Sequence, residues 1–501
     1  MSLNKDILIL FAPNFRKMGC ELAQGYLKKN QNSKIYALCD GQKEVSEEIK
    51  QTLGNDLEEI WDLESEEEKW DLDNPIINYK DKIIDKYLGY DYLGKLIVSD
   101  RRIGFGFVRG ALVRNDKMKD KISKNSIYYP RNYCLNLFYF INKILDISKP
   151  KVVFCYAIAS SISLILADLC KIKGITFTTI KSSRIEDYFF IDTNYNARFE
   201  VIENKLNKKN KTINENNLTK KIINNFYKSP LMPDYQVKKI EFIKKNSFLI
   251  MFLKLMKNFV RYLLSFIFSK NYEFYRLKRS FFEFKITINK LFIQKKYFKN
   301  ELPIKQKFIF FTLQVEPEAS ISIYSPYQSD QIGIIEALAK SAPSDMIIVV
   351  KEHIPMLGRR PKDYYKIISK IPRVLLINTY FNSIEILKKS EIVATISGTI
   401  AWEALLYKKK VMILGDSPYL CFKNGIVKAR FYEDYSKAIK KLIDMQIVKD
   451  EEIKKFINCV LDISFKMDSG LIWRGNYDSF SKHERELCIK NILSSIESIL
   501  T

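Results

Sequence analysis

The sequence has 501 residues, which is long enough for two or three domains that each bury a core. A hydrophobic fraction of 47% excludes an intrinsically disordered chain. The 82 Lys and Arg residues against 58 Asp and Glu give a formal charge of +24, which favours a polyanionic neighbour such as nucleic acid, an anionic membrane or a phosphate-bearing substrate. The abundance of Lys, Asn and Ile also fits an AT-rich coding bias, which would raise the basic charge without serving a function.

The eight cysteines are scattered, with no CxxC pair and no metal-ligand spacing. This pattern predicts reduced core thiols of a cytosolic protein. The first residues, MSLNKDILILFAPNF, contain a short apolar run without a signal-peptide cleavage site. We therefore expect a cytoplasmic protein whose first apolar run is a buried strand.

Apolar runs alternate with helix-compatible segments in two parts of the chain, which predicts an α/β fold with two doubly wound, Rossmann-like domains. Residues 1–200 form the first, with DILILFAP, KIYALCD, KPKVVFCYAIAS and ITFTTIKSSR as strands. Residues 301–501 form the second, with QKFIFFTLQ, DMIIVVKEH, RVLLIN, EIVATIS and KVMILG as strands and with C-terminal helices.

Residues 201–300 separate these domains as a basic, Phe/Lys-rich helical insertion or linker. Its first part, residues 203–228, is rich in Lys and Asn and indicates a surface excursion or a mobile linker. Residues 240–300 hold 14 Lys and Arg against 3 Glu, interleaved with Phe, Tyr, Leu and Ile.

The stretch from Ser247 to Phe268 is compatible with a helix whose polar residues fall on one narrow stripe. Three cations near its middle argue against a transmembrane span. Two interpretations stay open: a buried inter-domain helix with a solvated stripe, and an interfacial helix with its apolar side in lipid. A nucleic-acid groove is disfavoured, because no helix-turn-helix, RNP-type or zinc signature accompanies the charge. The stripe consists of Lys254, Lys257, Asn258, Arg261 and Ser265.

Three polar motifs follow predicted strands of the second domain, where doubly wound sheets bind ligands. In TLQVEPEASIS, the carboxylates of Glu316 and Glu318 could bind sugar hydroxyls, or one of them could act as a general base. The alternative is a polar loop with a capping serine.

The second motif, VVKEHIPMLGRR, presents Lys351 and His353 at a strand end, followed by Arg359 and Arg360. An imidazole can donate to a phosphate oxygen, and two guanidiniums can clamp the same group. A histidine buried in an apolar core would not normally lie among so many charged residues.

The third motif, ATISGTIAWEAL, places Ser397, Gly398 and Thr399 in a turn between a strand and a helix. Glycine permits close approach of the backbone, and the hydroxyls and N–H groups at the helix start would face an anion. Glu403 lies one turn into the helix, where its carboxylate could bind a ribose diol. Three such motifs at strand ends of one domain predict a convergent site.

These motifs, EPEAS, VKEHIPMLGRR, ATISGTIAWEAL and ILGDSPY, together with Asp330–Gln331, resemble the capsule polysaccharide biosynthesis family, which includes Kdo transferases. The resemblance runs from Phe310 to Tyr419 and is looser in the first half of the chain. It implies a GT-B-like fold with the acceptor on the N-terminal side and the nucleotide sugar on the C-terminal side.

The resemblance also implies residue roles. His353 would contact the nucleotide phosphate, the Ser397–Thr399 turn would cradle it, and Glu318 would lie at the reacting sugar, with Glu403 on the ribose or base. Two departures stand out: His353-Ile354-Pro355 replaces a His-Pro pair, and Glu316-Pro317-Glu318 replaces a Gln-Pro-Glu pattern, which changes the charge beside the reacting centre.

The main prediction is a glycosyltransferase that transfers a sugar from a nucleotide donor, such as CMP-Kdo or a related acidic sugar, to a surface or capsular polysaccharide. We expect no cofactor beyond the nucleotide-sugar co-substrate and no metal, since no DxD motif lies in a suitable loop. The expected partners are a lipid-linked or polysaccharide acceptor and an anionic membrane surface, with no nucleic acid. The expected location is cytoplasmic, peripheral at the inner face of the cell membrane.

Two other functions remain open. One is a nucleotide-sugar 2-epimerase, which would not need a lipid-seeking segment. The other is a non-catalytic scaffold of polysaccharide assembly, which the intact KEH and SGT sequences disfavour.

Overall fold

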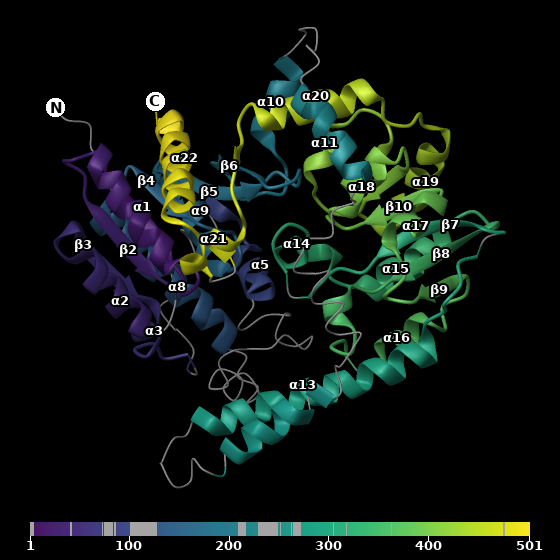
Figure 1. The fold of residues 1–501 in the computed structure, drawn as a ribbon, viewed down its shortest axis with the longest axis horizontal. Coiled ribbons are helices and arrows are strands. Elements are labelled where there is room, and N and C mark those ends of the chain that lie inside the picture. Colours follow the sequence, from purple (N-terminus) through teal and green to yellow (C-terminus); the bar gives the residue numbers. More distant parts are fainter. Residues whose placement is uncertain are drawn as a thin grey trace. The chain divides into compact units, whose positions relative to one another are not determined.

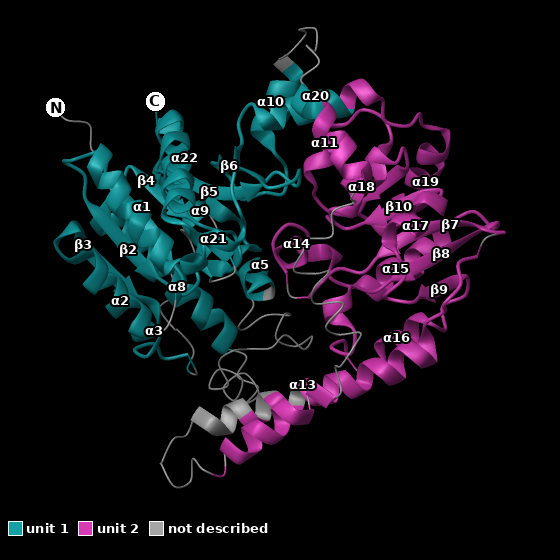
Figure 2. Ribbon diagram, in the orientation of Figure 1, with its two compact units in different colours: residues 1–105, 120–219, 453–501 teal, residues 106–119, 220–452 magenta. Residues whose placement is uncertain are grey.

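The structure is a computed structural model that divides into two compact units (Figure 2). Unit 1 comprises residues 1–105, 120–219 and 453–501, and unit 2 comprises residues 106–119 and 220–452. The structure describes residues 5–40, 43–72, 74, 84, 87–100, 128–208, 217–228, 249–250, 252–261, 263, 272–303, 305–316, 318–361, 363–473 and 476–500.

Unit 1 is built on a seven-stranded sheet in the order β13-β6-β5-β4-β1-β2-β3 (Figure 1). The strands β1 to β5 pair in parallel, whereas β6 pairs antiparallel with both β5 and β13. The strands are β1 (Ile7–Phe11), β2 (Ile35–Cys39), β3 (Leu57–Asp62), β4 (Val152–Cys155), β5 (Thr176–Ser182), β6 (Tyr188–Asp192) and β13 (Phe465–Lys466).

The helices of unit 1 connect these strands and cover the sheet. They are α1 (Arg16–Lys29), α2 (Lys43–Leu53), α3 (Leu63–Glu67), α5 (Tyr92–Ser99), α8 (Tyr129–Ser148), α9 (Ser161–Lys173), α10 (Glu200–Lys208), α21 (Gly470–Trp473) and α22 (Lys482–Leu500). Two further helices, α11 (Asn217–Lys228) and α20 (Asp450–Leu461), span the boundaries of the two units.

The predicted strands of the first half form because helices cover both faces of a central parallel sheet, so continuous apolar runs are favoured there. Every residue of β1 is buried, and β4 is buried throughout. The predicted helix after β4 is α9, which begins with a capping box at Ser160 and ends at Gly174 with a φ of +66°. The first apolar run of the chain is thus a buried strand, as predicted.

Unit 2 is built on a six-stranded parallel sheet in the order β12-β11-β10-β7-β8-β9. The strands are β7 (Lys307–Thr312), β8 (Met346–Lys351), β9 (Val374–Ile377), β10 (Ile392–Thr395), β11 (Lys410–Ile413) and β12 (Ile426–Lys428). The helices are α13 (Tyr272–Tyr297), α14 (Ala319–Ser322), α15 (Gln331–Ser341), α16 (Tyr364–Ile368), α17 (Ser383–Lys389), α18 (Ile400–Leu406) and α19 (Tyr435–Asp444). All five strands predicted from residue 301 onward are present. The predicted fold class, two doubly wound α/β units of a GT-B-like protein with a basic helical segment between their strands, is confirmed.

The predicted domain 301–501 differs from the structure at its C-terminal end. Residues 453–501 belong to unit 1, where β13 extends the sheet by pairing with β6 and α22 packs on α1. Ile492 of α22 is fully buried in the same core cluster as Ile9 of β1. The amphipathic pattern of α22 predicts that the helix packs, but it does not identify which sheet it covers.

The segment 201–300 is helical where it is described, except at its last three residues, where Lys299 forms a β-bridge with Ile377. The Lys/Asn-rich stretch predicted as an excursion or linker contains α10 and α11, with residues 209–216 outside the described part. Of the predicted helix Ser247–Phe268, residues 249–250, 252–261 and 263 are described, and they are helical. Among the described residues, no helix combines the length and the apolar character needed to cross a bilayer.

The cysteines match the prediction of core thiols. All eight are free, and seven are buried. Burial raises the pKa of the Cys155 thiol to about 12, so this group stays protonated and unreactive at neutral pH.

Replacing Ile492 by Ala tests the assignment of α22 to unit 1. The substitution should lower the free energy of unfolding of unit 1 by about 2–5 kcal/mol, because it leaves a cavity in the core. Hydrogen exchange should accelerate in β1 and β4 but not in β7 and β10. Lys490→Ala, an exposed position on the same helix, should change neither. Faster exchange confined to β7 and β10 would instead support a domain at 301–501.

Candidate functional site at the strand ends of unit 2

The three polar motifs lie at the carboxyl ends of neighbouring strands. Starting from β7, the chain adds β8 and β9 on one side, and then β10, β11 and β12 on the other. The direction therefore reverses between β7 and β10, which is the topological switch point where doubly wound sheets bind ligands. The EPEAS loop follows β7, the KEH loop follows β8, and the SGT turn follows β10. The predicted convergence of the motifs is what the sheet order produces.

A buried ion pair lies beneath these loops. The Arg360 guanidinium donates to both carboxylate oxygens of Glu352, at 2.8 Å and 3.0 Å, and its Nη1 lies 3.4 Å from Oε2 of Glu316. The side chains of Arg360 and Glu352 are 1% and 0% exposed. Tyr365 also donates to Glu352, at 2.9 Å, and the Arg360 guanidinium lies over the Tyr364 ring. This cluster joins the loops after β7 and β8.

A chain of amide contacts extends the cluster toward β10. Arg360 donates to the backbone carbonyl of Gln314 at 2.6 Å, and the Gln314 N–H donates to Gln331 Oε1 at 2.7 Å. The Gln331 amide nitrogen in turn donates to Glu316. On the other side, Gln314 Nε2 donates to the Thr395 hydroxyl at 3.2 Å. The three loops are therefore tied together below the surface.

Gly398, in the SGT turn, packs against this network of contacts. Its N–H donates to Thr395 Oγ1 at 3.2 Å, and a Cβ atom on Gly398 would lie 2.8 Å from that oxygen and 2.9 Å from Gln314 Nε2. The glycine is therefore required by the packing of the turn against Gln314 and Thr395. The sequence predicted a glycine for close approach of phosphate; the structure gives a different steric reason for it.

Two of the predicted site residues, Glu318 and His353, are exposed above the buried cluster. The Glu318 carboxylate accepts from the Ser320 hydroxyl at 2.9 Å, and Ser397 Oγ donates to the Ser320 carbonyl at 3.2 Å. Desolvation by the surrounding protein lowers the pKa of His353, while the nearby Glu318 and Glu352 carboxylates raise it. The net effect is a lowered pKa, which favours the neutral form of the His353 imidazole.

Lys351 and Glu403 form a second electrostatic pair. Lys351 is buried at the end of β8, where its ammonium donates to the Ser383 hydroxyl at 2.9 Å. Desolvation lowers the pKa of Lys351 to about 8, although Glu403 and Glu352 oppose the shift. Desolvation raises the pKa of Glu403 to about 7, with Lys351 opposing it. Both groups thus change charge near neutral pH, a property that is typical of functional sites.

Arg359 points away from the strand ends and pairs with α13. Its guanidinium donates to both oxygens of Glu283, at 3.0 Å and 2.9 Å. The neighbouring Gly358 has a φ of +82°, and a Cβ atom there would lie 2.9 Å from the carbonyl oxygen of Ile286. The loop after β8 is therefore held against α13.

The structure thus divides the predicted site residues into two groups. Glu318, His353 and Thr399 are exposed, and Ser397, Gly398 and Glu403 are partly exposed. Glu316, Lys351 and Arg360 are buried, and Arg359 is engaged by Glu283. The predicted clamp of two guanidiniums is not what these side chains form, because each one already binds a carboxylate. Gln314, Thr395 and Glu283, which support the site, were not predicted from the sequence, although Gln314 is the last residue of a predicted strand.

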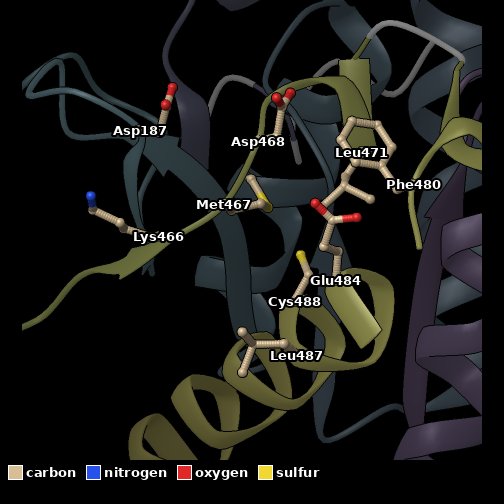
Figure 3. Close-up of a pocket in the computed structure, with 9 residues that line it drawn as sticks. All are labelled: Asp187, Lys466, Met467, Asp468, Leu471, Phe480, Glu484, Leu487 and Cys488. Carbon is tan, nitrogen blue, oxygen red and sulfur yellow. The ribbon is translucent and has the colours of Figure 1, made fainter. Parts of the chain in front are cut away.

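A separate cavity of about 220 Å³ lies in unit 1 and contains none of the predicted site residues (Figure 3). Lys466 of β13 and the next residue, Met467, line it on one side, and Glu484 and Cys488 line it from α22. Two of the carboxylates that line it bind local turns: Asp468 accepts from the Gly470 N–H, and Glu484 accepts from Ser481. The cavity is smaller than most small-molecule sites.

Unit 2 is thus a doubly wound unit whose strand-end loops gather carboxylates, a histidine and hydroxyls at the switch point of the sheet. Residues 239–449, which lie within unit 2, match the model of the family described as capsule polysaccharide biosynthesis protein. The resemblance predicted from the motifs is therefore confirmed over this segment.

Individual relatives match more distantly. Protein FixF of Sinorhizobium fredii is 32% identical over 119 residues, which make up 22% of this chain and 27% of that protein. The match thus spans about a quarter of the relative's length. Among solved structures, KpsC of Thermosulfurimonas dismutans, described as a beta Kdo 2,7 transferase, is 11% identical with a TM-score of 0.34, covering 71% of this chain and 88% of that one. The UDP-GlcNAc 2-epimerase of Neisseria meningitidis is 13% identical with a TM-score of 0.28, covering 98% of this chain and 100% of that one.

Replacing Arg360 by Met should destabilise unit 2 by about 3–5 kcal/mol, because the buried Glu352 and Glu316 carboxylates lose their guanidinium while most of the side-chain volume is kept. Arg359→Met removes a neighbouring, partly exposed ion pair and should cost at most about 1 kcal/mol. Denaturant unfolding of both variants measures the difference. Equal losses would show that Arg360 is no more important to the fold than its neighbour.

Gly398→Ala should lower the free energy of unfolding of unit 2 by about 1–3 kcal/mol, because the added methyl group overlaps Thr395 and Gln314. Gly94→Ala, a helical glycine with nothing within 4 Å of the added carbon, is the matched control. It should be neutral or stabilise by up to about 1 kcal/mol. A Gly398→Ala variant that unfolds like the control would contradict the packing explanation.

Proposed function

We propose that this protein is a metal-independent glycosyltransferase that transfers a sugar from a nucleotide-activated donor to a capsular or surface polysaccharide. The match to a capsule polysaccharide biosynthesis family supports the class of reaction. The single observation that carries the proposal is that exposed Glu318 and His353 follow the neighbouring strands β7 and β8 at the switch point, in the loops joined by the buried Arg360–Glu352 ion pair.

The exposed groups suit the two halves of a glycosyl transfer. The bond between the donor sugar and its phosphate breaks, and the acceptor hydroxyl oxygen forms the new glycosidic bond. In this proposal, Glu318 accepts the proton of that hydroxyl as the general base. His353 donates a hydrogen bond to the departing phosphate, and the hydroxyls of Ser397 and Thr399 bind the same group. Lys351 supplies positive charge from below.

The buried groups are positioning residues in this proposal. Glu352 binds Arg360 and also accepts from the His353 N–H at 2.7 Å, so it fixes the backbone that carries the imidazole. The change from an amide to a carboxylate at Glu316 is accommodated by Arg360 and Gln331. The extra negative charge of Glu316 is therefore paired inside the buried cluster. Because this charge does not face the substrate, the donor can still be an acidic sugar such as Kdo, carried by CMP. Glu403, beside Lys351, is placed on the ribose or base.

The acceptor and the location complete the proposal. A capsular product suggests an acceptor that is lipid-linked or is itself a polysaccharide, bound on the side of unit 1. We place the protein in the cytoplasm, peripheral to the inner face of the cell membrane, where such an acceptor would be reached.

A panel of CMP-, UDP- and GDP-sugars, added separately to the purified protein, tests the donor. One class should raise the melting temperature, since a ligand at a hundred times its Kd stabilises the folded state by about 2.7 kcal/mol. Stabilisation by UDP-GlcNAc with formation of its 2-epimer would instead assign the protein to the epimerases. Absence of stabilisation by every nucleotide sugar would favour the scaffold function.

His353→Ala should abolish turnover with the donor so identified, while the melting temperature without ligand stays unchanged because the side chain is exposed. The chain contains one other histidine, His483 on α22, which is also exposed and lies in unit 1. His483→Ala is therefore the matched control and should keep full turnover. Near-normal turnover in His353→Ala would refute the proposed role of the imidazole.

A further inference from the structure

The helix over residues 249–263, in unit 2, exposes large apolar side chains along most of its described length. Leu253 is 57% exposed and Val260 is 51% exposed, although a folded protein normally buries such residues. Contiguous apolar surface of this kind marks an interaction site. The exposed apolar residues of the helix are Leu249, Phe252, Leu253, Met256, Phe259, Val260 and Leu263.

These seven residues share one face. At about 100° per residue, they fall within an arc of about 120° on the helix surface. Asn258 lies outside the arc, is buried, and donates to the Ser280 hydroxyl of α13. The helix therefore turns its polar Asn258 toward α13 and the centre of its apolar arc away from it, while Phe252, nearer one edge of the arc, also contacts α13. The sequence predicts Asn258 on the same polar stripe as the cations, whereas the structure places it in a helix–helix contact.

α13 fixes this helix to the strand-end loops of unit 2. The Phe252 and Phe284 rings pack with centroids 6.0 Å apart, so the two helices are joined at a second point. One face of α13 holds the loop after β8 through the Glu283–Arg359 ion pair. Phe281 and Phe292, which are 61% and 71% exposed, lie about half a turn away from Glu283. Further apolar surface thus lies on the side of α13 that faces away from the loop.

Cations accompany the apolar face. Lys254, Lys257 and Arg261 are all exposed and lie together beside the apolar arc, on the more polar part of the helix. Apolar side chains on one face and Lys or Arg on the other are the pattern of a helix that lies in the plane of a membrane interface. A second copy of the chain fits this face less well, because a two-fold interface would bring the two sets of cations together.

We infer that the apolar face of helix 249–263 is a docking surface for an anionic phospholipid bilayer. The inference rests on the membrane location in the proposed function and identifies the residues responsible for it. The apolar side chains enter the interface, and the cations bind lipid phosphates. Because α13 also holds the loop that carries His353, docking fixes the orientation of the nucleotide-binding unit toward the lipid.

Co-sedimentation with vesicles tests the inference. Wild-type protein should bind vesicles of phosphatidylglycerol and phosphatidylcholine in equal amounts and be released as salt is raised. Replacing Lys254, Lys257 and Arg261 by Gln should weaken this binding about a hundredfold, at about fivefold for each cation. Replacing Lys437, Lys440 and Lys441 by Gln, three exposed lysines on α19, is the matched control and should have little effect.

A second variant removes the apolar contribution. Leu253, Met256 and Val260 replaced together by Ser should abolish binding to both anionic and pure phosphatidylcholine vesicles, with no loss of melting temperature because all three are exposed. Wild-type protein that ignores anionic vesicles at low salt, or a Ser variant that binds them normally, would overturn the inference. A wild-type dimer that the Ser variant converts to a monomer would assign the face to a second copy.

The readouts separate this inference from the proposed function. Stabilisation by a nucleotide sugar is measured without vesicles and should be the same in the wild type and in both membrane variants. Loss of vesicle binding with intact nucleotide stabilisation would leave the glycosyltransferase proposal unaffected.

Discussion

The arrangement of unit 2 depends on one buried guanidinium. Arg360 is the cation to which the Glu352 and Glu316 carboxylates and the Gln314 carbonyl are bound, and nearly all of its surface is removed from water. Burying such charges is unfavourable unless each is paired and hydrogen-bonded, so the loops that supply the partners have one favourable arrangement. The buried cluster therefore fixes the positions of the loops that carry the exposed groups.

This division explains why the motif residues do not all face solvent. A site for a phosphate-bearing substrate needs groups that can be reached and other groups that keep them in place. In unit 2, Glu318 and His353 belong to the first kind, and Arg360, Glu352 and Glu316 belong to the second. Arg359 serves a third purpose, because it attaches the loop to α13 and thus to the exposed apolar helix. A single segment of twelve residues, from Val349 at the end of β8 to Arg360 in the following loop, participates in all three.

Much of the fold could be predicted because a parallel sheet imposes a clear pattern. Strands such as β1, β4, β7 and β10 are short apolar runs, and helices separate them at regular intervals. The pattern did not predict β3, an edge strand with the sequence LEEIWD whose residues are partly or fully exposed. It also did not predict β13, which has only two residues. The assignment of α22 to unit 1 depends on contacts between residues more than 400 positions apart, which no local pattern encodes.

The candidate site, like the fold, could be predicted only in part. The rule that ligands bind at strand ends brought the three motifs together correctly. The sequence could not distinguish an arginine that faces a ligand from one that lies beneath the surface, because the burial of Arg360 depends on contacts with other loops, such as that with Glu316. The orientation of Asn258 toward another helix could not be predicted for the same reason. Its partner Ser280 lies on a separate helix, so the polar stripe alone did not indicate which face is covered.

The interrupted path of the chain through unit 1 has a consequence for synthesis on the ribosome. The strands of unit 2 are complete once residue 452 has been made, whereas the sheet of unit 1 still lacks β13 and its core still lacks α22. Domains usually fold in the order in which they are made, with the N-terminal one first. In this protein, the sheet of unit 1 is the first to be started and the last to be completed. Part of the apolar surface of its nascent strands therefore stays uncovered while the whole of unit 2 is synthesised. During that interval the N-terminal half is the part of the protein most in need of a chaperone.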